Sequence, residues 1–215
     1  MNNRWGTPVA ELVEHSKRIV EARLQNSSIR AISGSMVSYL GEVGFKSAGF
    51  GGGAGVLAGL KQRATGESLS LMECTGNGVV HLAVDGQYVT VLPLNNETLQ
   101  VESQQLLAMA GNLQTNVTFA GLGGMSSGQG LFTTTVTGTG QVALLSAGGP
   151  LIHLEVNPNL PLVVDPDAFV AAKGQLQQSF VTDVSWRDAV GAGGGEAFSL
   201  RWQGHGVVSI QPAER

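Results

Sequence analysis

The sequence predicts an all-β protein built from three related β units, because one pattern of apolar residues and glycines occurs three times. Each copy opens with Gly-Glu or Gly-Gln, alternates apolar and polar residues, contains a Gly-x-Gly motif and continues through a second apolar stretch. Alternation with a period of two is typical of half-buried strands. The copies read GESLSLMECTGNGVVHLAV from Gly66, GQGLFTTTVTGTGQVALLS from Gly128 and GEAFSLRWQGHGVVSIQP from Gly195.

The composition favours the same fold class. Glycine supplies 31 of the 215 residues, about twice its usual share. Charged residues make up only 13% of the chain, about half of what a soluble domain usually carries. Such a chain suits many strands joined by tight turns, and a thinly charged surface is often one that packs against other subunits.

The Gly-x-Gly motifs are predicted to form structural turns between two strands, because glycine readily adopts the positive φ that a tight hairpin or a bulge needs. Successive motifs lie 62 and 66 residues apart. This spacing predicts units over about 18–90, 91–155 and 156–212 in a single domain, 18–212, after an N-terminal extension, 1–17. The predicted turn glycines are Gly76, Gly78, Gly138, Gly140, Gly204 and Gly206.

Helix is predicted only in short pieces. Thr7 followed by Pro8 is typical of a helix N-terminus, so we expect a short N-terminal helix before a strand near 18–24. Single helical turns are expected at strand ends within 103–110 and 165–172. The valine, threonine and glycine content elsewhere favours strands.

The chain is predicted to be cytoplasmic and to bind no nucleic acid. Its first twenty residues lack the apolar run of a secretory signal, and no stretch approaches the length of a transmembrane helix. The net charge is −4, with no cluster of lysine and arginine to attract phosphate backbones. The single cysteine, Cys74, is expected to be a small buried hydrophobe.

The motifs together resemble one known family. They are SGSMVSYLGEVGFK, the glycine-rich loop at 49–61, LVVDPDAFVAA and the three repeated segments. In this order they are similar to the altered-inheritance-of-mitochondria family, number twenty-four, over about residues 18–212. The resemblance implies β-sandwich or double-stranded β-helix units around a pseudo-threefold axis, as in the tryptophan RNA-binding attenuation protein fold. It implies no catalytic motif.

The glycine-rich loop, GFGGGAGVLAGLK, is the first candidate for a functional segment. It lacks the Gly-Lys-Ser/Thr ending of a phosphate-binding loop, and no βαβ unit surrounds it, so no cofactor is expected. Its apolar residues must be covered by the same chain, by another subunit or by a membrane, and few basic residues accompany them. The candidate interface residues are Phe50, Val56, Leu57 and Leu60.

No catalytic or metal-binding residues are predicted. None of the four histidines has a second ligand at metal-site spacing, and Asp165-Pro-Asp167 is a turn signature. We therefore expect a non-enzymatic scaffold or accessory protein that acts as a homo-oligomer or with a protein partner. The alternative is a small-ligand-binding β protein with a pocket between repeats.

Overall fold

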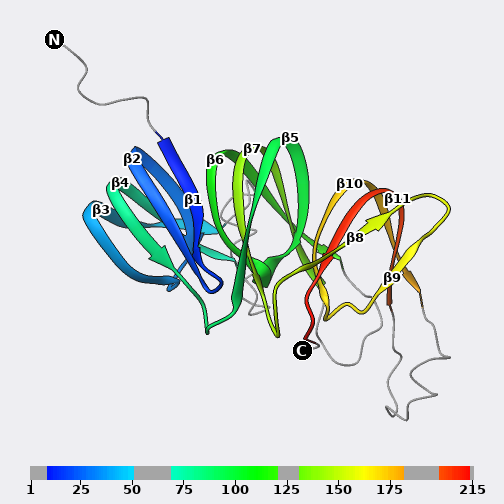
Figure 1. The fold of residues 1–215 in the computed structure, drawn as a ribbon. Coiled ribbons are helices and arrows are strands. Elements are labelled where there is room, and N and C mark those ends of the chain that lie inside the picture. Colours follow the sequence, from blue (N-terminus) through cyan, green and yellow to red (C-terminus); the bar gives the residue numbers. More distant parts are fainter. Residues whose placement is uncertain (1–8, 51–68, 121–130, 182–198, 214–215) are drawn as a thin grey trace.

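The computed structural model describes residues 9–50, 69–120, 131–181 and 199–213 (Figure 1). In these residues the chain is all-β, as predicted, and its eleven strands form one antiparallel sheet. A single 3-10 turn, Ser103–Gln105, interrupts them. The strands are β1 (Val9–Ser16), β2 (Ile19–Ile32), β3 (Met36–Phe50), β4 (Ser70–Leu82), β5 (Tyr88–Glu102), β6 (Leu106–Ala120), β7 (Leu131–Ser146), β8 (Ile152–Val156), β9 (Leu162–Val164), β10 (Phe169–Val181) and β11 (Ser199–Ile210).

The sheet runs in the order β3-β4-β2-β6-β7-β5-β10-β11-β8, with β1 added to β2 and β9 added to β11. Figure 1 shows the strands gathered in three groups in chain order, β1–β4, β5–β7 and β8–β11. In each group one long hairpin pairing joins two strands that follow each other in the chain, β3 to β4, β6 to β7, and β10 to β11. The second strand of each hairpin also pairs on its other side. There β4 pairs with β2, β7 pairs with β5, and β11 pairs with both β8 and β9.

Two short seams join the groups. In the first, residues 29–31 of β2 pair antiparallel with 108–110 of β6. In the second, residues 99–101 of β5 pair antiparallel with 171–173 of β10. Three residue pairs at each seam therefore connect hairpins that are otherwise paired along more than ten residues.

The predicted N-terminal helix is wrong, because Val9–Ser16 is strand β1. The segment alternates, with Leu12 only 2% exposed, and it pairs with β2 from Val9 to Ser16. The side chain of Gln141 from β7 accepts a hydrogen bond from the Leu12 amide at 2.8 Å and donates to its carbonyl at 3.1 Å. Backbone groups of β1 thus find partners in the adjacent β2 and in one side chain of the distant β7, and these contacts outweigh the local Thr-Pro signal. The predicted strand near 18–24 is confirmed as part of β2.

The predicted helical turns take a smaller form. Residues 103–105 make the 3-10 turn, which the Glu102 carboxylate caps by accepting a hydrogen bond from the Gln104 amide. Residues 165–168 form a hydrogen-bonded turn in which the Asp165 side chain accepts from the Asp167 amide at 3.0 Å. Strand begins again directly after each turn, at Leu106 and at Phe169.

The prediction that the Gly-x-Gly motifs are hairpin turns is also wrong, because all three lie inside strands β4, β7 and β11. Gly76 has φ +140°, and a Cβ there would fall on the carbonyl oxygen of Glu42 in β3. The glycines allow two backbones to approach where the paired strands bend, as the curved β3 and β4 in Figure 1 show. The other predicted turn glycines also lie within paired strands, namely Gly78, Gly138, Gly140, Gly204 and Gly206. The second glycine of each motif lies opposite another glycine: Gly78 opposite Gly41, Gly140 opposite Gly111, and Gly206 opposite Gly174.

Three buried clusters form the core. The first joins β1, β2 and β4 to side chains of β5–β7, and the second joins β5–β7 to β10. The third contains residues of β8–β11, with Phe169 stacked on Trp202 at 5.2 Å between ring centroids. Apolar burial on this scale is the main force holding a sheet of this kind together.

Candidate functional site

The two ends of the sheet are the first candidate functional surface. Among the described strands, β3 is hydrogen-bonded to β4 alone, so its other side is an edge. On this strand Tyr39 is 48% exposed and Leu40 is 67% exposed, and the Tyr39 ring contacts Phe45 edge-on at 5.2 Å. A long edge strand with exposed apolar side chains is a template for pairing with another strand.

The opposite end of the sheet is formed by β8 and β9, which pair with β11. Val163 in β9 is 48% exposed, and Leu160, just before it, is 66% exposed. Figure 1 shows β3 and β9 at opposite ends of the row of strand groups. We refer to 38–40 as the β3 edge and to 162–164 as the β9 edge.

Both edges lie at the same positions relative to the paired glycines as the residues that form the internal seams. Residues 108–110 and 171–173 directly precede Gly111 and Gly174, each of which lies opposite a Gly-x-Gly glycine of the next strand. The β3 edge, 38–40, directly precedes Gly41, which lies opposite Gly78. The β3 edge therefore occupies the position that makes a seam in the other two groups.

The β9 edge matches the other side of the seams. The seam segment of β2 begins at Ile29, which lies opposite Cys74. The seam segment of β5 begins at Leu99, which lies opposite Val136. Cys74 and Val136 each lie two residues before the first glycine of a Gly-x-Gly motif. Leu162 lies opposite Trp202, which is two residues before Gly204. By register the β9 edge, 162–164, corresponds to 29–31 and to 99–101.

The predicted interface loop lies mostly outside the described residues. Val56, Leu57 and Leu60 belong to that part of the chain, and Phe50 is the last residue of β3, where it pairs with Ser70. The role predicted for these four residues therefore stays a prediction. The sequence does not indicate these edges, because a free edge depends on strand order rather than on local pattern.

The four histidines have different surroundings. His205 lies within β11, opposite Gln175, and not at a turn. His153 lies within hydrogen-bonding distance of Ser209, with 2.8 Å between Nδ1 and Oγ. His15 and His81 lie close together with Glu21 between them, which the sequence did not indicate because His15 and His81 are 66 residues apart.

Cys74 is buried in the first core cluster, opposite Ile29, as a small apolar residue. Burial raises the pKa of its thiol to about 11, with the Glu73 charge adding to the effect. Because the thiolate is the nucleophile, we expect Ellman's reagent at pH 8 to label native Cys74 at least about 100-fold more slowly than the unfolded chain. Equal labelling rates with and without urea would contradict this burial.

The searched part of the chain contains no helix that is long and apolar enough to cross a membrane.

Comparison with known proteins places the fold and the family. The crystal structure of protein SPYM3_0169 from Streptococcus pyogenes is similar, with a TM-score of 0.72 and 22% identity over 97% of this chain and 94% of that one. No curated protein matches the sequence significantly. The sequence model described as mitochondrial biogenesis AIM24 matches residues 10–213, nearly the whole chain. The resemblance noted in the sequence is thereby confirmed, and the chain belongs to the mitochondrial biogenesis AIM24 family.

Proposed function

We propose that this protein is a non-enzymatic, cytosolic scaffold or accessory protein that works by self-assembly. One observation carries the proposal. The β3 edge and the β9 edge lie at the positions, relative to the paired glycines, at which residues of the other groups pair in the two internal seams. The described residues contain three hairpins but only two such seams between them. The third seam would form between the β9 edge of one copy and the β3 edge of the next.

The expected register of this third seam follows from the other two. Ile29 pairs with Ala110, and Leu99 pairs with Lys173, each partner directly preceding the seam glycine. By the same rule Leu162 would pair with Leu40, and Val163 with Tyr39 of the next copy. Strand addition of this kind supplies main-chain hydrogen bonds and covers apolar side chains.

The exposure of the side chains agrees with this arrangement. At the internal seams Ala110, Met109 and Ala172, which by register correspond to Leu40 and Tyr39, are at most 5% exposed. At the β3 edge Leu40 and Tyr39 are 67% and 48% exposed. Covering them in an assembly would recover apolar burial of the kind that the internal seams already have.

Polar contacts also distinguish seams from edges. Arg30, in the first seam, donates to the Leu113 carbonyl of β6, and Gln100, in the second, donates to the Gln178 side chain of β10 at 3.0 Å. At the corresponding place the β9 edge carries the apolar Val163. An apolar residue at this position suits an interface that is covered by another copy.

We further propose that the three hairpins, each with its added strand, are three repeats of one unit. Their recurring glycine registers support this. A pseudo-threefold axis within one chain would need the β9 edge to meet the β3 edge of the same chain. Because these edges lie at opposite ends of the row in Figure 1, we assign the third seam to neighbouring copies instead.

An interface between two different edges is heterologous, so it builds a ring if the rotation closes and a filament if it does not. We expect light scattering over a dilution series to give masses that are multiples of the 22.3 kDa chain. Leu40→Lys and Val163→Lys would each raise the dissociation constant at least about tenfold, because a lysine would be buried without a partner. Val9→Lys is the matched control, since Val9 is 49% exposed on β1, outside both edges.

Mixing the two variants gives the sharper result. Leu40→Lys keeps an intact β9 edge, and Val163→Lys keeps an intact β3 edge. Their mixture is expected to form a dimer of one copy of each and nothing larger. A wild-type monomer at all concentrations, or a Val163→Lys dimer formed without the second variant, would refute the heterologous seam.

A further inference from the structure

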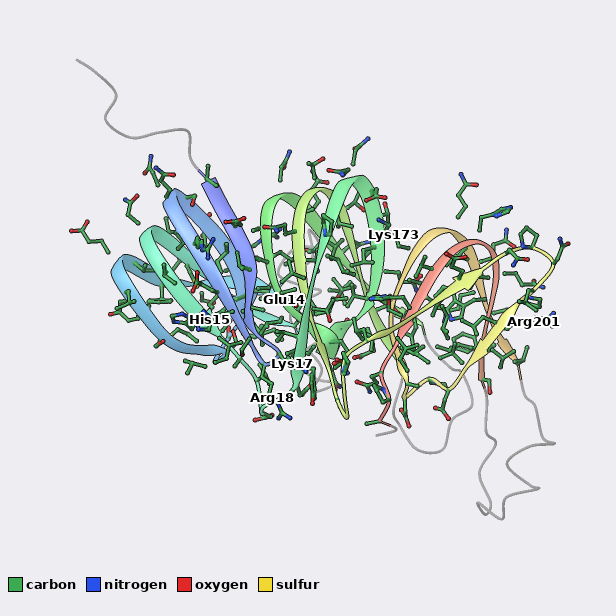
Figure 2. The ribbon with its side chains drawn as sticks, in the orientation of Figure 1. Glu14, His15, Lys17, Arg18, Lys173 and Arg201 are labelled. Carbon is green, nitrogen blue, oxygen red and sulfur yellow. The ribbon has the colours of Figure 1, made fainter. Side chains whose placement is uncertain are left out.

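His15, Glu21 and His81 form a compact group on three neighbouring strands, β1, β2 and β4. Glu21 and His81 are direct cross-strand partners. His15 is the extra residue of a β-bulge between Glu14 and Ser16, where β1 approaches its turn into β2. Figure 2 shows His15 at this end of β1, near Lys17 and Arg18 of the turn. The bulge brings the His15 side chain toward Glu21.

The distances in this group suit a shared metal ion. Oε2 of Glu21 lies 3.1 Å from Nδ1 of His15 and 3.5 Å from Nε2 of His81. The three ligand atoms all lie within 4.8 Å of one another. Ligands about 2.0–2.2 Å from a tetrahedral Zn²⁺ are separated by about 3.3–3.6 Å. Two of the three separations are therefore already close to those of a zinc site.

The neighbouring side chains hold these ligands in place. The other ring nitrogen of His81, Nδ1, lies 2.9 Å from Oγ of Ser38, so it can donate to that hydroxyl and leave Nε2 free as a ligand. Arg23 donates from Nε to the second oxygen of Glu21, Oε1, at 2.7 Å. This contact leaves Oε2 turned toward both histidines.

Charge and burial agree with a cation site. The Arg23 guanidinium donates a hydrogen bond to the Glu21 carboxylate. Arg23 also reaches Glu11 at 3.4 Å, so its positive charge is shared between two carboxylates. The side chains of Glu21 and His81 are only 15% and 19% exposed, whereas that of His15 is 54% exposed and leaves the site open to solvent.

We propose that His15, Glu21 and His81 bind one zinc ion, with solvent in the fourth position. Imidazole and carboxylate ligands suit a first-row divalent ion, and two histidines with one glutamate are a known zinc ligand set. The ion would tie the bulge of β1 to β2 and β4. This site departs from the prediction of no metal ligands made from the sequence, and it does not depend on self-assembly.

Calorimetric titration of the tag-free, metal-stripped, full-length protein with Zn²⁺ tests the site. We expect one zinc ion per chain, and a melting temperature raised by about 5–10 °C when zinc is at about 100 times its dissociation constant. Glu21→Gln and His81→Gln should each weaken binding at least about tenfold. His153→Gln is the matched control, because that histidine has the same kind of serine contact and should leave zinc binding unchanged.

His15→Gln provides a second variant that does not depend on a buried position. Because His15 is more than half exposed, its replacement should leave the fold and the circular dichroism spectrum unchanged while weakening zinc binding at least about tenfold. Co²⁺ in place of zinc should give the visible absorption of a tetrahedral site, which the same variant abolishes. Binding that is not saturable at one ion per chain, or that His15→Gln leaves unchanged, would overturn the proposal.

Discussion

Gly138→Ala is expected to lower the free energy of unfolding by about 3–5 kcal/mol. Gly138 lies in β7, between β5 and β6, with φ +133°. A Cβ there would fall on the carbonyl oxygen of Asn112 and close to the Leu113 Cα at 3.4 Å. Both obstacles are backbone atoms, so only a shift of the paired strands can relieve them. Urea unfolding followed by circular dichroism measures the change.

Gly44→Ala is the matched control for this substitution. Gly44 also lies inside a strand, β3, but without positive φ, and the nearest atom to an added Cβ is the Thr75 carbonyl oxygen at 3.8 Å. An alanine fits there, and it reduces the freedom of the unfolded chain, so stability should stay the same or rise by less than about 1 kcal/mol. Equal destabilisation by both alanines would show that the close backbone approach at Gly138 is not the cause of its loss.

Trp202→Ala is expected to cost about 3–5 kcal/mol of unfolding free energy, because it leaves a large cavity. Trp202 is 1% exposed and stacks on Phe169 in the third core cluster. Trp202→Phe should cost less than about 2 kcal/mol, since it keeps an aromatic ring against Phe169. It also removes the indole N–H, which is buried without a hydrogen-bond partner in the described structure. Similar losses for both variants, measured by urea unfolding, would argue against cavity formation as the cause.

The repeated strands could be predicted from the sequence, because alternation of apolar residues directly reflects which side of a strand is buried. The glycines were misplaced for a physical reason. Glycine with positive φ is found both in hairpin turns and in mid-strand bends, so the motif alone does not distinguish them. The pairing of Gly78 with Gly41 places this glycine within a paired strand. Thr7-Pro8 is typical of a helix start, but Leu12 pairs with β2 and bonds to the side chain of the distant Gln141, and these contacts favour a strand.

The candidate sites could not be predicted, because each depends on contacts between residues distant in the sequence. The zinc ligands come from three strands, and His15 reaches Glu21 only through a bulge. The β3 and β9 edges become visible only once the order of all strands is known. The apolar residues of the predicted interface loop do not specify what covers them.

The distribution of the core also affects how the protein unfolds. The first cluster ties β1, β2 and β4 to β5–β7, whereas the third is confined to β8–β11. The last group is joined to the rest through one three-pair seam, a few β10 side chains in the second cluster and several polar contacts, such as Lys173 to Glu97. Chains of units coupled only to their neighbours lose structure stepwise when one coupling is weak. We therefore expect the C-terminal group, β8–β11, to unfold before the rest of the chain. In the proposed assembly its β9 edge would at that point still be paired with the next copy.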